Sequence, residues 1–111
     1  MAETEDLAGR IEQVAATVED VERHVDAAEV RYGLRGVAFA AVSAGSAAFR
    51  LRPDVAEAAL ATPDVRPSDR GPGWVTLAPD VFDRFALDRA ASWFAAAARY
   101  AAETAPGRRA N

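Results

Sequence analysis

Four arginines fall at alternating positions in two short stretches of this sequence, an arrangement that would gather positive charge on one face of a β-sheet. The four are Arg31, Arg35, Arg50 and Arg52. Guanidinium groups bind phosphates and carboxylates through paired hydrogen bonds. We therefore expect these residues to form a site for an anionic partner such as DNA. The alternative is a solvated face whose arginines pair with Glu29 or Asp54.

Residues that could support catalysis are scattered. His24 is the only histidine and the chain has no cysteine, so His24 is expected to be a solvated surface residue rather than a metal ligand. No lysine is present, which excludes Schiff-base enzymes, phosphate-loop nucleotidases and kinases. None of the four serines lies in a G-x-S-x-G nucleophile elbow, so a serine hydrolase is not expected. The serines are Ser43, Ser46, Ser68 and Ser92. We expect no enzyme, no cofactor and no metal site.

A stretch rich in proline and glycine, Arg66 to Gly73, precedes Trp74. A phosphate-binding loop needs a lysine and an immediately following helix, whereas a short apolar strand follows here. The stretch is therefore expected to be a simple connection, in which Arg66 and Arg70 would extend the arginine face if the loop turns that way. Trp74 is expected to be a half-buried strand residue that packs on the final helix.

The composition describes one globular domain. The chain has 111 residues, of which 50% are hydrophobic and 27% charged, and no apolar run long enough to cross a membrane. The start, MAETEDL, lacks the features of a secretory signal, so a cytoplasmic location is expected. A net charge of −4 limits any nucleic-acid contact to a local patch. All thirteen basic residues are arginine and alanine is abundant, which indicates a GC-rich bacterial genome.

The N-terminal third repeats apolar residues at intervals of three and four, from Leu7 to Ala28. One interpretation is a single helix from Thr4 to Ala28. The other, which we favour, is a helix that stops near Ala16, with a restart at Thr17 because Thr17 to Asp20 resembles an acidic capping box. The valines of this segment would then form a seam suited to a homodimer.

The rest of the chain alternates short strands with helices. Period-two patterns predict a three-stranded meander within Glu29 to Leu51, and Pro53 opens a short helix. Trp74 to Leu77 reads as a fourth strand, and a long helix follows that begins at Pro79 or Asp88. The predicted fold is α+β: one small domain, 1–111, in which an antiparallel sheet packs against an N-terminal, a short middle and a long C-terminal helix. The ordered core is expected to span about 4–103, with a frayed tail at 104–111.

Several passages share order and spacing with a known family: Gly36 to Ala40, Phe49 to Leu60, the loop running into Gly73 to Leu77, and Ala86 to Ala102. Together, over roughly Leu7 to Glu103, they resemble the MmcQ/YjbR family and, less closely, the TfoX N-terminal domain. The resemblance implies a compact α/β fold similar to secretion chaperones, a DNA-binding role and no agreed active site. The chain departs from the family pattern where Leu-Pro-Gly is usual, at Ala15 to Thr17, and where a lysine is usual, at Val37.

Two functions follow as expectations. The first is a non-enzymatic domain that binds an anionic partner such as DNA through the arginine face, and this binding should weaken with salt. The second is a protein interaction module that forms a homodimer through the valine seam or the sheet face, with no role in nucleic-acid binding.

Overall fold

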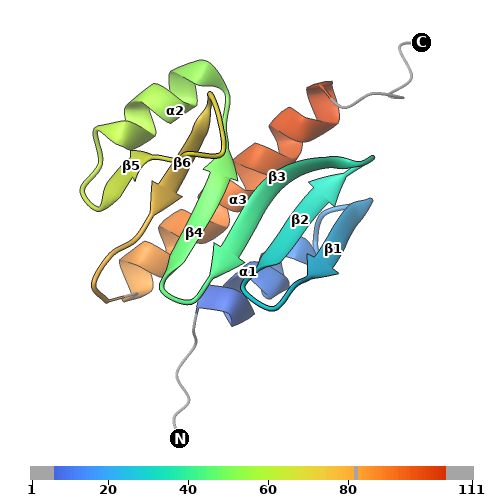
Figure 1. Ribbon diagram of the computed structural model, residues 1–111, viewed down its shortest axis with the longest axis horizontal. Helices are drawn as coiled ribbons and strands as arrows, with labels where there is room; N and C mark the ends of the chain where they lie inside the picture. The colour runs from blue at the N-terminus through green and yellow to red at the C-terminus, as the bar shows by residue number, and fades with distance from the viewer. Residues whose placement is uncertain (1–6, 82, 105–111) are drawn as a thin grey trace, which may run out of the picture.

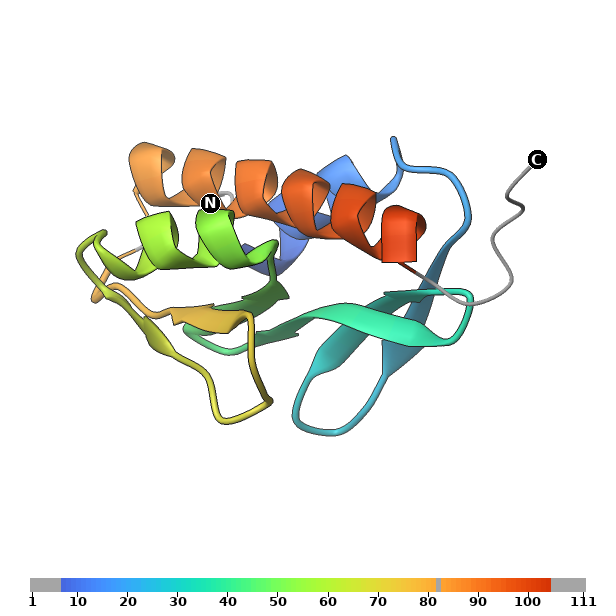
Figure 2. The same cartoon turned by 90° about the horizontal axis from the view of Figure 1, so that it is seen from above.

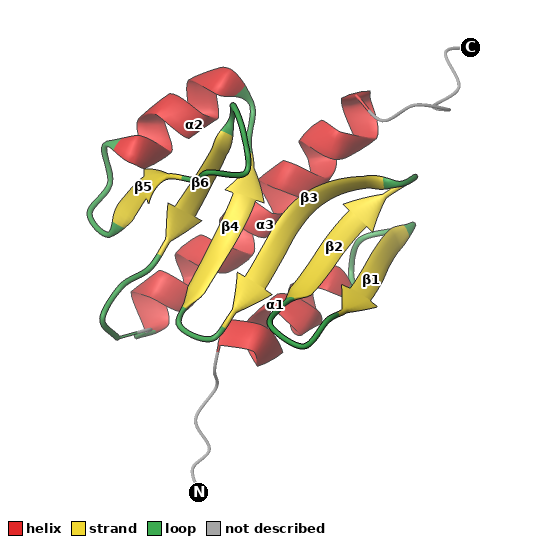
Figure 3. Ribbon diagram, viewed as in Figure 1, coloured by secondary structure: helices red, strands yellow, loops and turns green. Residues whose placement is uncertain are grey.

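Six antiparallel strands form one sheet in the order β1-β2-β3-β4-β6-β5, and three helices pack against it (Figures 1 and 3). This computed structural model describes residues 7–81 and 83–104 of the chain. The strands are β1 (Val21–Val25), β2 (Val30–Leu34), β3 (Val37–Ser43), β4 (Ser46–Arg50), β5 (Val65–Pro67) and β6 (Trp74–Leu77). The helices are α1 (Leu7–Ala15), α2 (Pro53–Leu60) and α3 (Arg84–Thr104). The predicted α+β class and the order of its helices are confirmed.

All three helices lie on the same face of the sheet (Figure 2). Helix α3 crosses β2, β3 and β4, α1 packs beside α3, and α2 lies against β5 and β6. The face of α3 that meets the sheet is rich in alanine, and Ala90, Ala97 and Ala101 are completely buried. Such small side chains let the helix lie close to the strands, and no helix of the described residues covers the opposite face.

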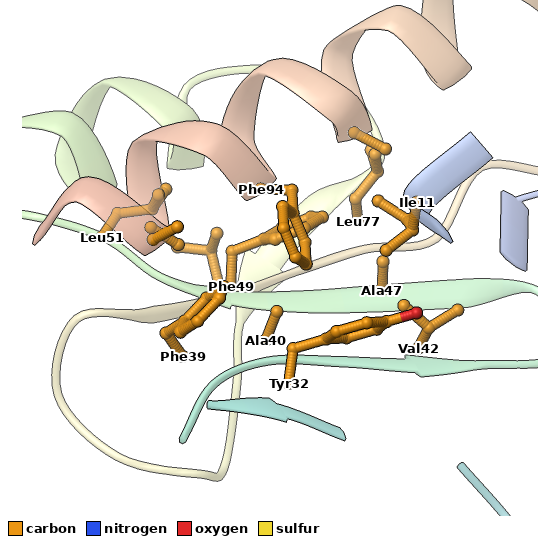
Figure 4. Packing of buried hydrophobic residues seen from close by; sticks show 14 of the residues in the cluster. Ile11, Tyr32, Phe39, Ala40, Val42, Ala47, Phe49, Leu51, Leu77 and Phe94 are labelled. Atoms are coloured by element: carbon orange, nitrogen blue, oxygen red, sulfur yellow. The ribbon is translucent and has the colours of Figure 1, made fainter. Parts of the chain in front are cut away.

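An aromatic cluster holds α3 to the sheet (Figure 4). Phe94 is fully buried, and its ring meets Tyr32 and Phe39 edge to face with ring centres 5.0 and 5.2 Å apart. Ile11 of α1 and Leu77 of β6 complete the same core. Edge-to-face ring pairs of this kind stabilise the fold by more than the burial of their apolar surface alone.

A β-bulge lets β3 present two neighbouring residues to this core. Ala40 pairs with Tyr32 and Ala38 pairs with Gly33, so Phe39 has no residue opposite it. Phe39 and Ala40 are both fully buried in the core that the helices cover. A β-carbon at Gly33 would lie only 2.9 Å from the carbonyl oxygen of Val37, so the bulge requires glycine there.

The N-terminal segment does break, but a strand follows the break where the sequence predicted a second helix. Helix α1 ends at Ala15, and the Thr17 hydroxyl donates a 2.7 Å hydrogen bond back to the Val14 carbonyl. Asp20 then turns the chain with a φ of 66°, and β1 begins at Val21. The predicted helical valine seam is therefore wrong, since its residues are divided between a helix and a strand. Thr4, the predicted helix start, lies outside the described residues.

The sheet is wider than predicted because β1 and β5 add an edge strand at each side of the four predicted strands. Strand β5 has three residues and ends in proline, which suits an edge because proline has no N–H to donate. Helix α3 begins between the two predicted starts: Asp83 accepts a 2.9 Å hydrogen bond from the Ala86 N–H and caps it. The predicted tail, apart from Thr104 at the end of α3, lies outside the described residues.

Candidate functional site on the uncovered face of the sheet

The face of the sheet that no described helix covers, called the outer face below, carries a row of directly paired residues across all six strands. In strand order the row is His24, Arg31, Ala41, Ala48, Thr76 and Arg66. The row places two alanines and a threonine in the middle and an arginine toward each side. The centre of the outer face is thus a shallow floor of small side chains with positive charge at its margins.

Ala41 and Ala48 are only 2% and 6% exposed, although they do not belong to the core beneath the helices. Their neighbours on the outer face must therefore shield them. Two hairpin connections, 26–29 and 68–73, project beyond the outer face (Figure 2). Side chains from these connections meet above the sheet.

Arg70 and Glu29 join the two connections. The Arg70 Nη2 lies 2.5 Å from the Glu29 Oε1, and the Arg70 guanidinium lies 5.6 Å from the centre of the Trp74 ring. Because β3 and β4 separate β2 from β6, this ion pair spans the middle of the outer face. Arg31 also approaches Glu29, at 3.8 Å. The carboxylate of Glu29, which is 16% exposed, is shared by two guanidinium groups.

Trp74 is the half-buried strand residue that the sequence predicted, but it does not pack on the final helix. It alternates with Val75 and Leu77, which are buried beneath the helices, so Trp74 lies on the outer face and is half-buried there. The Trp74 ring lies against the Arg70 guanidinium rather than against a residue of α3. The tryptophan of the final helix, Trp93, packs instead against Phe49 on the helix side, with ring centres 6.3 Å apart.

The structure does not bring the four predicted arginines onto one face. Arg31 lies on the outer face, whereas Arg35 lies in the tight turn between β2 and β3, with a φ of 51°. The guanidinium of Arg50 lies 4.8 Å from the centre of the Tyr100 ring on α3. Arg52 precedes α2 and forms ion pairs with Asp54 and with Glu103 of α3, at 3.4 and 3.8 Å. Arg70 meets Arg31 at Glu29, and Arg66 lies on the same face at the far edge strand β5. The sequence suggested these two arginines only as an extension.

A second group of polar residues lies on the helix side, between α1 and β1. Glu12, Arg23 and Tyr32 line an open cavity of about 350 Å³ together with Ala15, Ala16 and Val21. Arg23 forms an ion pair with Glu12. A hydrogen bond with Tyr32, and then the charge of Glu12, raise the pKa of the Arg23 guanidinium. The sequence showed no sign of this group because its members lie on three different elements.

Tyr32 should make folding stability depend on pH in alkaline solution. Burial raises the pKa of its phenol above the usual value near 10, against the opposing effect of Arg23. As pH rises past about 10, the unfolded chain loses this proton before the folded chain does, so the free energy of unfolding falls. We expect Tyr32→Phe to remove most of that fall, measured by urea unfolding at about pH 8 and about pH 11.

The matched control for this measurement is Tyr100→Phe, which changes the only other tyrosine of the chain. Because no lysine or cysteine is present, few other side chains titrate in this range. Equal alkaline losses in wild type and Tyr32→Phe would contradict the assignment of the effect to the buried phenol.

The remaining candidates lie apart from one another. His24 is exposed on β1. Within 7–81 and 83–104, no three side chains of histidine, aspartate or glutamate gather as a metal ion requires. Over the same ranges, no helix is long and apolar enough to cross a membrane. The proline- and glycine-rich connection turns with Gly71 and Gly73 at positive φ and carries Arg70 out over the sheet.

Comparison of the chain with protein-family models, with curated proteins and with solved structures gave no match.

Proposed function

We propose that this chain is a non-enzymatic binding domain that holds an anionic partner, double-stranded DNA in the first instance, against the outer face of its sheet. The residues assigned to this contact are Arg31, Arg66 and Arg70, with Trp74 beside them. A DNA-binding role is also what the resemblance to the MmcQ/YjbR family implies. The proposal keeps Arg31 from the predicted set and replaces the other three positions.

The observation that supports the proposal is the placement of arginines on both sides of an alanine floor. Arg66 is exposed, and no carboxylate of the described residues lies within ion-pair distance of it. Arg31 and Arg70 meet at Glu29, where a phosphate could take the place of the carboxylate. Ala41 and Ala48 are shielded by their neighbours, so phosphates would meet the arginines above the strands rather than the strands themselves.

The net charge of −4 shapes the expected affinity. The overall field of the protein repels DNA, so binding must come from the local cluster and should be weak. Three phosphate contacts predict that the association constant falls about 40-fold between 50 and 200 mM salt. Binding is therefore best sought at low ionic strength.

The test is fluorescence anisotropy of a labelled DNA duplex titrated with the protein at about 50 and about 200 mM salt. The variant carries Arg31→Ala, Arg66→Ala and Arg70→Ala. Its matched control carries Arg84→Ala, Arg89→Ala and Arg99→Ala, which removes three charges from α3 on the other side of the molecule. We expect the first variant to lose most of the binding at 50 mM salt and the control to lose little. Equal losses in both variants, or no binding by wild type at low salt, would overturn the proposal.

Glu29→Gln gives a change in the opposite direction. The substitution removes the carboxylate shared by Arg31 and Arg70 while keeping a side chain of the same size; Asp26 stays 3.9 Å from Arg31. Affinity for the duplex should rise several-fold at 50 mM salt. A fall in affinity would mean that Glu29 holds the arginines in a binding arrangement rather than competing for them.

A further inference from the structure

Strand β1 is an edge of the sheet, and it is the more exposed of the two edges that could pair with another chain. All its residues except Val21 are exposed, and Val25 is 66% exposed although it is apolar. Strand β5, at the other edge, has three residues and ends in proline. An edge strand presents unpaired backbone N–H and C=O groups along its free side. Figure 3 shows no further strand or helix beside β1 at this edge.

The sequence of β1, Val-Glu-Arg-His-Val, is nearly symmetric about Arg23. If two copies pair antiparallel about that residue, Val21 faces the Val25 of the second copy and Glu22 faces its His24. The valine pair then covers the exposed Val25, and a histidine N–H can donate to the carboxylate of Glu22. Each pair occurs twice because the arrangement has two-fold symmetry.

Other registers are less favourable. Paired residues place their side chains on the same face of a sheet. The helices of the two copies therefore lie on the same side of the joined sheet only when one residue of β1 faces itself in the second copy. The nearest alternatives to Arg23 as this central residue are Glu22 and His24. Centring on Glu22 places two Glu22 carboxylates opposite each other within β1, and centring on His24 places Glu22 opposite Asp26. Centring on Arg23 places Asp20 opposite Asp26, but both of these residues lie outside β1. Like charges directly opposite destabilise an antiparallel pair. The centre at Arg23 brings two guanidinium groups together, but each already has an ion pair with Glu12 of its own chain.

We infer that a second copy of this chain pairs with the β1 edge, antiparallel and centred on Arg23, to form a homodimer with a continuous sheet. Charged residues on an edge strand usually block such pairing. Here Glu22 and His24 of one copy face His24 and Glu22 of the other, so these side chains favour the pairing. Because the contact is a single five-residue strand, the interface is small and the dimer should dissociate in the micromolar range.

The inference is tested by sedimentation velocity over a range of protein concentrations with two charge variants. His24→Glu places Glu22 opposite a glutamate, and Glu22→Arg places an arginine opposite His24. We expect wild type to form a two-chain species and each variant alone to raise the dissociation constant roughly tenfold or more.

An equimolar mixture of the two variants should restore the two-chain species. In the mixed pair, the glutamate introduced by His24→Glu faces the arginine introduced by Glu22→Arg. The Glu22 that the first variant retains faces the His24 that the second variant retains. Both contacts then join groups that attract each other, as in wild type.

If the mixture forms the two-chain species, both variants are folded, and each variant alone is monomeric because pairing is lost. This matters for Glu22→Arg, because the Glu22 carboxylate accepts a 3.2 Å hydrogen bond from the Gly36 N–H and supports the next turn. The control is Glu57→Arg, an equal charge change at an exposed position of α2, which should dimerise like wild type and should not restore His24→Glu when mixed with it. A monomeric wild type, or a mixture of the two variants that stays monomeric, would overturn the inference. It does not depend on DNA binding, since the assay contains no nucleic acid.

Discussion

Phe94→Ala is expected to lower the free energy of unfolding by about 3–5 kcal/mol, which would leave a domain of this size barely folded or unfolded at 25 °C. Phe94 is completely buried, and its ring touches the rings of Tyr32 and Phe39 from two neighbouring strands. Truncation removes both edge-to-face contacts and leaves a cavity between α3 and the sheet. The backbone cannot collapse into that space easily, since alanines already bring α3 close to the strands. Urea unfolding followed by far-UV circular dichroism measures the loss.

Phe85→Ala is the control for this prediction. Phe85 lies on the same helix, is 74% exposed and should change stability by no more than about 0.5 kcal/mol. If Phe94→Ala were as mild as Phe85→Ala, the packing of α3 across β2 and β3 would be contradicted.

Gly33→Ala is expected to destabilise the domain by about 1–3 kcal/mol, although alanine is the smallest possible addition and favours strands more than glycine does. The new β-carbon would lie 2.9 Å from the Val37 carbonyl oxygen, and a backbone atom cannot move aside as a flexible side chain can. Relief requires β2 and β3 to separate at the bulge, which would pull Phe39 away from Phe94. We expect the urea midpoint to fall and the near-UV aromatic signal to weaken.

A suitable control is Gly45→Asn in the turn between β3 and β4. Gly45 has a φ of 81°, but a β-carbon there meets nothing within 4 Å, and asparagine tolerates positive φ. Its cost should stay below about 1 kcal/mol. A larger loss for Gly45→Asn than for Gly33→Ala would show that the close approach at the bulge is unimportant.

The central elements could be predicted because their sequence patterns have a single period. Tyr32 and Leu34 alternate with polar residues, Pro53 marks a helix start, and the stripe around Phe94 repeats at helical spacing. Strand β1 was missed because Val14, Val18, Val21 and Val25 satisfy a helical spacing, while the last two also fit a strand. Tertiary pairing with β2 decides between the two, and a single segment carries no information about that pairing.

The candidate site was predicted only in part. Side chains alternate between the two faces of a sheet only within a strand, and the alternation gives no information beyond the end of the strand. Arg31 lies mid-strand, and alternation placed it correctly. Strand β4 ends at Arg50, whose guanidinium stacks on Tyr100 from a helix about fifty residues away in the chain, and Arg52 belongs to the start of α2. Arg70 reaches the outer face only because its connection bends over the sheet, and no local pattern encodes the direction of such a bend.

The two tryptophans lie on opposite faces of the sheet, which gives each face its own optical reporter. Trp74 lies beside Arg70 on the outer face, whereas Trp93 lies against Phe49 beneath the helices. In a Trp93→Phe protein the emission comes from Trp74 alone, and it responds to whatever binds the outer face. A Trp74→Phe protein reports instead on the packing of α3. Binding and unfolding can therefore be followed separately by intrinsic fluorescence, with no dye attached to either surface.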